Sequence, residues 1–147
     1  MEKIIILGAG GHAASVIDSL EREGIYDIAG YVANDEKVGN SDYPIIGTDS
    51  DLERLYQSGI RNIAIGIGYL GKSDLREKLY KHIKLIGFFL PIIRDPSAMI
   101  SKRAEIAEGT FIGKGVIINR RAVIKEACII NSGAIVEHDC KVDKFSH

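Results

Sequence analysis

The sequence predicts an α/β domain built on a parallel sheet, followed by a parallel β-helix. Three observations support this fold class. Apolar runs alternate with helix-like segments up to residue 90, and an aliphatic residue recurs at every sixth position from residue 100 onward. Sixteen of the 147 residues are glycine, against roughly 7% in an average protein. The positions of these glycines therefore bear on both halves of the chain.

The first part of the chain alternates strands and helices. Apolar, β-branched runs predict strands, and apolar residues at helical spacing between start and stop signals predict helices. Ser50 and Glu53 have the form of a capping box. Right-handed crossovers between such elements give a parallel sheet. Strands are expected at 3–7, 26–33, 62–67 and 85–90, and helices at 12–24, 50–59 and 73–83.

A glycine-rich turn, Gly8 to His12, joins the first strand directly to the first helix. Residues without a Cβ let backbone amides face an anion, and the helix N-terminus adds partial positive charge, so the loop suits a phosphate. Gly8, Gly10 and Ala13 also satisfy the dinucleotide pattern G-x-G-x-x-G/A. The alternative is that the glycines only permit a tight turn. His12 either contacts a ligand in the crevice or is solvated.

Two later strand ends carry further candidates for the same crevice. The second strand ends at Asn34–Glu36, where an acidic residue often takes a ribose hydrogen bond, although a polar turn is the alternative. Gly66 and Gly68 close the third strand, where glycines let a ligand approach the backbone or serve the turn. Arg76, on the following helix, is expected to be solvated rather than to bind a phosphate or carboxylate.

The second part of the chain carries a six-residue repeat. Helices repeat near 3.6 residues and strands near 2, so neither explains a period of six. The period indicates a hexapeptide parallel β-helix, in which each hexapeptide forms one side of a triangular coil and its aliphatic residue fills the axis. The predicted inward residues are Ile100, Ile106, Ile112, Ile118, Ile124, Ile130, Val136 and Val142.

Four positions after each inward residue, where the coil must turn tightly, almost all residues are small. Cys128 and Cys140 occupy this slot on different sides of the prism. Both are expected to be structural fillers rather than a disulfide or a nucleophile. Turns are also expected at Gly109, Gly113, Gly115 and Gly133.

Composition excludes several classes of function. The formal net charge is −1, so the chain has no electrostatic footprint for wrapping nucleic acid or an anionic membrane. The apolar run Ile4–Leu7 is too short for a signal peptide or a membrane span, which makes the cytoplasm the expected location. No Cys/His cluster has zinc spacing, and no metal site is predicted.

Glu137, His138 and Asp139 interrupt the repeat with a histidine flanked by two carboxylates. A nearby carboxylate fixes the tautomer of an imidazole and raises its basicity, as a general base requires. His147 follows nine residues later. Each histidine alone is compatible with a solvated side chain, but together with the carboxylates they indicate a site.

These features together resemble the bacterial sugar O-/N-acyltransferases. The resemblance rests on the loop Gly8–His12, the small α/β domain, and hexapeptides carrying the segments 136–140 and 145–147. That family includes enzymes of the sialic-acid O-acetyltransferase type and N-acetyltransferases for nucleotide-linked amino sugars.

The resemblance implies a Rossmann-like domain at 1–95 that holds the sugar substrate, and a left-handed β-helix at 96–147. It also implies a homotrimer that binds acetyl-CoA between neighbouring β-helices. The acceptor would be a nucleotide-sugar or a sialic-acid-type sugar. The β-helix has fewer than three coils after Ile100 and no capping segment, so an incomplete domain is expected.

The resemblance also implies roles for individual residues. His138 matches the catalytic base, Asp139 the acidic neighbour that raises its basicity, and Glu137 a second candidate for that neighbour. His147 matches a histidine that contacts acetyl-CoA near its thioester. The implied substrate-binding residues are Gly10, Gly11, His12, Asn34, Asp35 and Gly68.

The sequence departs from the family at two places and leaves other functions open. Adjacent acids are frequent where this chain has Asn34 and Asp35, and an acid or Asn often follows the glycine after the third strand, where this chain has Gly66-Ile67-Gly68-Tyr69. The identity of the nucleotide and sugar, and an amine against a hydroxyl acceptor, therefore stay open. The alternatives are a dinucleotide-dependent enzyme and a non-catalytic nucleotide-sugar-binding or trimerisation fragment.

Overall fold

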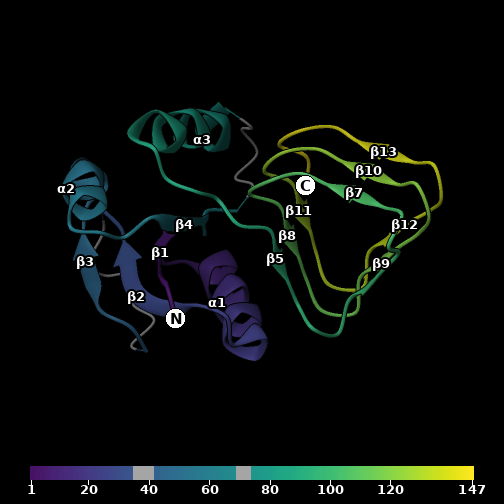
Figure 1. Cartoon of the computed structure of the whole chain (residues 1–147), viewed down its shortest axis with the longest axis horizontal. Coiled ribbons are helices and arrows are strands. Elements are labelled where there is room, and N and C mark those ends of the chain that lie inside the picture. Colours follow the sequence, from purple (N-terminus) through teal and green to yellow (C-terminus); the bar gives the residue numbers. More distant parts are fainter. Residues whose placement is uncertain (35–41, 69–73) are drawn as a thin grey trace.

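The computed structural model describes residues 1–34, 42–68 and 74–147. An α/β domain lies beside a triangular β-helix, and the chain passes once from the first to the second (Figure 1). Within the described part of the chain, no helix is both long and apolar enough to cross a bilayer.

The sheet of the α/β domain has four parallel strands in the order β3-β2-β1-β4. β1 (Lys3–Leu7), β2 (Asp27–Val32) and β4 (Asn62–Ile65) lie where strands were predicted. β3 (Ile45–Gly47) is a short edge strand that the sequence did not indicate. The central strand β1 is buried on both faces, which explains its unbroken apolar run.

Helices cover both faces of this sheet. α1 (Gly11–Glu23) packs on one face, and α2 (Leu52–Gln57) and α3 (Asp74–Ile86) pack on the other. α1 ends where predicted, because Gly24 adopts the left-handed conformation with φ 69°.

Two local predictions are wrong. The expected strand at 85–90 is mostly helix and coil, because α3 continues to Ile86 and stops at Gly87, where φ is 115°. Only Phe89 pairs, as an isolated parallel bridge to Asn62. The capping box is not formed by Ser50 and Glu53. It is formed by Thr48 and Asp51 at the start of the 3₁₀ helix η1 (Asp49–Asp51), where the Thr48 amide donates to Asp51 Oδ2 at 2.8 Å.

The β-helix confirms the hexapeptide repeat. Equivalent strands of successive coils pair in parallel with a spacing of 18 residues, so that Ile93 pairs with Phe111 and Phe111 with Ile129. Three hexapeptides therefore make one coil. The first strand, β5, begins at Ile93 and pairs with β8. The nine strands are β5 (Ile93–Arg94), β6 (Met99–Ile100), β7 (Glu105–Ile106), β8 (Phe111–Ile112), β9 (Ile117–Ile118), β10 (Val123–Ile124), β11 (Ile129–Ile130), β12 (Ile135–Val136) and β13 (Lys141–Val142).

The three faces of the prism differ in their outward residues. On the domain face (β5, β8, β11) the outward residues are buried with α1 in one apolar cluster. On the apolar face (β6, β9, β12) they are Met99, Ile117 and Ile135. On the polar face (β7, β10, β13) they are Glu105, Val123 and Lys141. Among the residues that the structure describes, the domain face is the one covered by the α/β domain.

The corners of the prism turn through left-handed residues. A positive φ occurs at every sixth position from Gly109 to Phe145. Gly109, Gly115 and Gly133 are therefore turn residues as predicted, but Gly113 is not among them. A Cβ on Gly113 would lie 3.1 Å from the Ser132 nitrogen, so that glycine serves close packing between coils.

Gly133→Ala is expected to destabilise the fold by about 1 kcal/mol, since a Cβ is unfavourable in the left-handed region. Its φ is 73° and a Cβ there would meet nothing within 4 Å, so the cost is conformational. Urea unfolding measures the change. Gly11→Ala, also without a Cβ neighbour but without a positive φ, is the matched control and should change stability by less. Equal losses in both variants would contradict the argument.

The two cysteines differ in burial. Cys128 is fully buried, and its thiol donates to the Asp143 carbonyl with a sulfur–oxygen distance of 3.0 Å. Cys140 is exposed, although Ala122, one coil earlier, is fully buried. Both are free thiols, and the filler role predicted for both applies within this chain to Cys128 alone.

Candidate functional site

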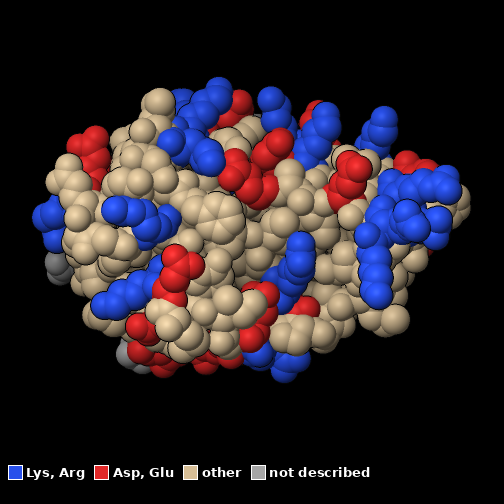
Figure 2. Space-filling view, viewed as in Figure 1, with Lys and Arg blue, Asp and Glu red and all other residues tan. Residues whose placement is uncertain are grey.

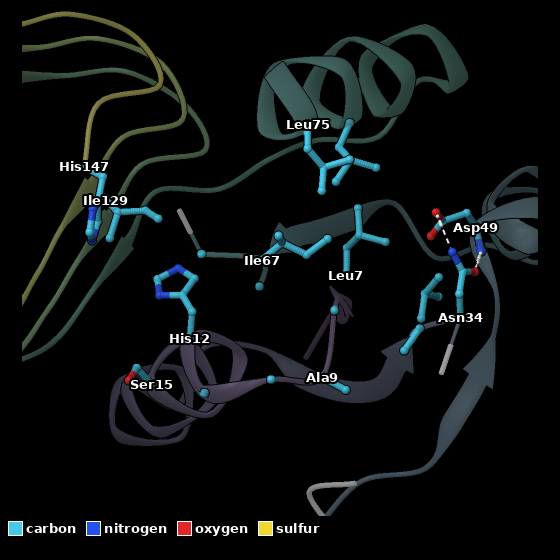
Figure 3. Close-up of a pocket in the computed structure, with 18 of the residues that line it drawn as sticks. Leu7, Ala9, His12, Ser15, Asn34, Asp49, Ile67, Leu75, Ile129 and His147 are labelled. Atoms are coloured by element: carbon cyan, nitrogen blue, oxygen red, sulfur yellow. Dashed lines mark hydrogen bonds between the residues drawn. The ribbon is translucent and has the colours of Figure 1, made fainter. Parts of the chain in front are cut away.

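A cavity of about 750 Å³ lies where the sheet of the α/β domain meets the β-helix. It opens at the carboxyl ends of β1, β2 and β4, beside the β1–β4 pair where the strand order changes direction. Crevices at such switch points are the usual ligand sites of open α/β sheets. Figure 3 shows residues of α1, β1, α3, the segment after β4 and the β-helix around it.

The glycine loop lines this cavity, and its positions are glycine for different physical reasons. Gly8 has φ 100°, and a Cβ there would lie 2.7 Å from Ile67 Cγ1, so the fold itself requires glycine. Gly10 and Gly11 have no neighbour within 4 Å of a Cβ and line the cavity. Helix α1 starts there with no side-chain cap and no acidic residue in its first turn. Its amides are therefore available to an anion.

The glycines after β4 also divide into two kinds. A Cβ on Gly66 would lie 2.9 Å from Ile6 Cγ2 and 3.0 Å from Ala13 Cβ, so Gly66 permits close packing of α1 on the sheet. A Cβ on Gly68 would lie 3.3 Å from His12 Cβ, and both residues line the cavity. Gly68 is thus the glycine of this pair that sits beside the His12 side chain.

His12 lies between the glycine loop and the β-helix. Its ring meets Phe111 edge to face with centroids 5.2 Å apart, and its Nε2 is buried without a hydrogen-bond partner among the described residues. Burial, then the positive charge of Arg76 and the nearby His147, lower the pKa of His12 to about 4. His12 is therefore neutral near pH 7, and of its two predicted alternatives the burial excludes a fully solvated side chain.

The lowered pKa predicts an acid-sensitive fold. His12 is free to protonate at about pH 6.5 when unfolded but only near 4 when folded, so the unfolded state binds more protons in this window. Stability should fall by up to about 3 kcal/mol as the pH drops from 6.5 to 4. His12→Gln should remove this part of the pH dependence in urea unfolding, whereas exposed His82→Gln should keep it. An unchanged slope in His12→Gln would contradict the prediction.

The opposite end of the cavity carries a polar pair from two strands' ends. Asn34 Nδ2 donates to Asp49 Oδ2 at 3.1 Å, and the Asp49 amide donates to Asn34 Oδ1 at 3.2 Å (Figure 3). Asn34 was predicted, but Asp49 was missed. Only the pairing of β3 with β2 brings it there, and nothing in the local sequence signals that pairing. Asp35 lies outside the described residues.

The β-helix contributes the third side of the cavity. Ile129, Asn131 and His147 line it, and His147 Nε2 lies 3.1 Å from Asn131 Nδ2. His147 was expected near the acyl donor, and the structure places it beside His12 (Figure 3). Asn131 carries no sequence signal, because it occupies an ordinary position of the repeat.

The predicted catalytic triplet lies elsewhere, at the corner between the apolar and polar faces. His138 Nδ1 is 2.9 Å from Asp139 Oδ2. The hydrogen bond with His138, and the positive charge of Arg121, lower the pKa of Asp139. Glu137 instead accepts a hydrogen bond from Asn119 Nδ2 at 3.1 Å. Asp139 is thus the carboxylate that holds the His138 ring.

The two candidate histidines of the β-helix do not meet within one chain. His138 and His147 are nine residues apart, which is half of the 18-residue coil, so they lie on opposite sides of the prism. His147 lines the cavity and His138 does not. The structure therefore brings together Gly10, Gly11, His12, Asn34, Gly68 and His147 and leaves Glu137, His138 and Asp139 apart.

Arg76 is buried rather than solvated. Its Nε donates to the Ala127 carbonyl at 2.9 Å and its Nη1 to the Ile67 carbonyl at 2.6 Å. Burial lowers the pKa of Arg76 to about 10. The guanidinium therefore ties the end of β4 to a corner of the β-helix and does not line the cavity. Tyr80 and Lys84, on the same face of α3, bond to Glu108 of the β-helix.

Among the described residues, no group of His, Cys, Asp and Glu side chains has the arrangement of a metal site.

The family model of the PglD N-terminal domain matches residues 3–83. No curated protein matches the chain significantly. Several solved structures do. PerB from Caulobacter crescentus, in complex with CoA and GDP-perosamine, is 35% identical with a TM-score of 0.86. The alignment covers 96% of this chain and 65% of PerB.

Two further solved structures share the fold. The acetyltransferase domain of PglB from Neisseria gonorrhoeae, in complex with acetyl coenzyme A, is 28% identical with a TM-score of 0.88, over 98% of this chain and 68% of that one. WeeI from Acinetobacter baumannii is 19% identical with a TM-score of 0.77, over 97% and 66%. The chain thus spans about two thirds of the length of the structures it resembles.

These matches confirm the predicted fold class, a Rossmann-like α/β domain followed by a left-handed β-helix. The family model covers more than half of the residues and includes the glycine loop and every strand of the sheet. The chain therefore belongs to the PglD N-terminal domain family.

Proposed function

We propose that the protein is a cytoplasmic, acetyl-CoA-dependent N-acetyltransferase acting on a nucleotide-linked amino sugar. The observation that carries this proposal is the cavity in which an uncapped helix N-terminus with two unobstructed glycines faces His12 and His147. Similar proteins with this fold bind GDP-perosamine with CoA, or acetyl coenzyme A. An amine acceptor is preferred to a hydroxyl on the strength of those relatives.

The acceptor half of the reaction is assigned to the α/β domain. The amides at Gly10 and Gly11 suit the diphosphate of a nucleotide-sugar, because an anion there meets both the free N–H groups and the helix dipole. Asn34, together with Asp35, which lies outside the described residues, is assigned to the nucleoside end. His12 and Gly68 are assigned to the sugar end. As a neutral imidazole, His12 accepts or donates a hydrogen bond without adding charge.

His138 is proposed as the general base. Attack of the sugar nitrogen on the thioester carbonyl carbon forms the C–N bond and breaks the C–S bond, and coenzyme A leaves as the thiolate. The nitrogen must lose a proton, which His138 takes, while Asp139 holds its Nδ1 and stabilises the resulting imidazolium. The thiolate then takes up a proton. His147 is assigned to the thioester end of acetyl-CoA.

This assignment requires more than one copy of the chain. His138 and the cavity with His147 lie half a coil apart on the same prism, so one active site must combine the cavity of one copy with His138 of the next. The apolar face supports such an assembly, since Met99 is 70% exposed and Ile135 60% exposed in the single chain. We propose a homotrimer in which the three apolar faces surround the axis.

A thiol-release assay tests the proposal. Purified protein is incubated with acetyl-CoA and GDP- or UDP-linked amino sugars, and free coenzyme A is measured with a thiol reagent. Release with an amino sugar, and none with the corresponding hydroxyl sugar, is the expected result. Absence of release with every nucleotide amino sugar, despite binding, would favour a second candidate, a nucleotide-sugar-binding module. The 74% exposure of the His138 side chain in the single chain favours that candidate.

A further inference from the structure

Four cations form a column along the prism corner that carries His138. Arg120 and Lys102 stand one and two coils below His138 in the same register, and Arg121 and Arg103 stand one and two coils below Asp139. Backbone bonds join these levels, from the Arg121 amide to Arg103 and from the Asp139 amide to Arg120. Lys102, Arg103, Arg120 and Arg121 are called the basic edge. Figure 2 shows positive side chains gathered at this end of the β-helix, away from the α/β domain.

The side chains of the basic edge are exposed to solvent. None of the four forms a salt bridge with any residue that the structure describes. The positive charges of Arg121 and Arg120 contribute to lowering the pKa of Asp139. Neighbouring strands are roughly 4.8 Å apart, so the stacked cations repel one another. An external anionic surface would relieve this repulsion.

The chain offers such a surface at another corner of the prism. A shallow hollow between α1 and the β8–β9 corner is lined by three acids, Asp18, Glu21 and Asp42, and by Lys114. Lys114 pairs with Asp18, which leaves a net charge of −2 from three acids and one lysine. This hollow, called the acidic groove, adjoins the proposed active site, since Ser15 lines both cavities.

The two surfaces lie at matching heights on the β-helix. Lys114 of the acidic groove and Arg120 with Arg121 of the basic edge belong to the same coil. Asn131 of the cavity and His138 belong to the next. Rotation about an axis parallel to the prism preserves height. When His138 of one copy enters the cavity of another, its two arginines therefore reach the level of the acidic groove.

The corners also match in a closed ring. On one side, the apolar face meets the domain face at the corner that contains the β8–β9 turn. On the other side, it meets the polar face at the corner of the basic edge. If the apolar faces surround the axis, each copy's basic edge meets the next copy's β8–β9 corner, as head-to-tail contacts in a cyclic assembly require. We infer that the basic edge docks on the acidic groove of the next copy and sets the register in which His138 enters its cavity.

This inference rests on the proposed shared active site, and its test uses mass rather than turnover. Arg121→Glu and Glu21→Lys are each expected to raise the dissociation constant of the oligomer about tenfold or more at low salt, since like charges then face each other. The charge-swapped double variant should restore the wild-type constant. Light scattering over a concentration series measures the mass. Lys78→Glu, an exposed position on α3 with the same charge change, is the control.

Three results would overturn the inference. One is weakening by Arg121→Glu no greater than by Lys78→Glu, and another is a double variant that stays dissociated. The third is an intact oligomer in Arg121→Glu with weaker binding of coenzyme A, which would make the basic edge a ligand site. If the double variant regains the oligomer mass but neither it nor the wild type releases thiol with any nucleotide amino sugar, the proposed reaction is contradicted and the proposed interface is supported. If the Arg121→Glu oligomer stays intact and turns over at the wild-type rate, the proposed interface is contradicted and the proposed reaction is supported.

Discussion

Replacement of His138 by alanine is expected to lower kcat by roughly 10²–10⁴-fold, the usual contribution of a general base. The imidazole is held by Asp139 at 2.9 Å and lies outside the cavity of its own chain. The variant should therefore bind the nucleotide-sugar with nearly unchanged affinity. Steady-state thiol release gives kcat, and calorimetric titration with the sugar gives the affinity. Turnover at the wild-type rate would remove His138 from the mechanism.

The flanking carboxylates provide matched controls for this experiment. Asp139→Asn removes the charge that holds the His138 ring and should lower kcat by less than His138→Ala, with an altered pH profile. Glu137→Gln should leave turnover close to wild type, because Glu137 bonds to Asn119 and not to the histidine. A larger loss from Glu137→Gln than from Asp139→Asn would assign the acidic neighbour to the other side of His138.

Mixing two inactive variants is expected to restore activity. His138→Ala lacks the base, and Gly11→Leu fills the cavity with a side chain at a position where the fold leaves space. If each active site combines the cavity of one copy with the base of the next, a random equal mixture of trimers should have about a quarter of its sites intact, one half times one half. Thiol release should then rise far above either variant alone.

The mixing experiment discriminates between one-chain and two-chain sites. Subunits are dissociated and reassembled together, and the same variants assembled separately and then combined serve as the control. If both halves of the site came from one chain, every mixed site would lack the base or the cavity. Activity would then stay at the level of the separate variants. That result would contradict the inference that His138 and the cavity of one chain, half a coil apart, belong to different active sites, and with it the proposed trimer.

The β-helix was predictable because its pattern is local. Each coil packs only on its neighbours, so one inward aliphatic residue per hexapeptide is enough to indicate the fold. The first strand escaped notice because Arg94 takes the inward register position opposite Ile112. The pairing of Ile93 with Phe111, and the burial of both against α1, place it in the prism.

The α/β domain was predictable where burial dominates and unpredictable where it does not. β4 is buried along its length and β1 from Ile4 to Leu7, and their apolar runs indicated this burial. The edge strand β3 has only three residues, none of them fully buried, so nothing in its composition marks it. The apolar residue Leu85 contributed to the wrong prediction of a strand at 85–90, because it is 86% exposed at the end of a helix.

The candidate site divides in the same way. Gly10, Gly11 and His12 follow from the strand-to-helix turn, a contact between neighbours in sequence. Asp49 and Asn131 arrive through strand pairing and docking of the β-helix. Arg76 was misjudged because its partners are backbone carbonyls of Ile67 and Ala127, which no residue pattern reveals.

The sequence alone determined the two architectures, the phosphate-type loop and the His138 triplet, because each depends on residues close together in the chain. The tertiary structure decided how these parts relate. Docking of the domain face on α1 brings His147 and Asn131 to the cavity, and burial beside Arg76 keeps His12 neutral. The 18-residue coil puts His138 on the far side of the prism. These relations depend on packing between residues far apart in sequence, and no local pattern encodes them.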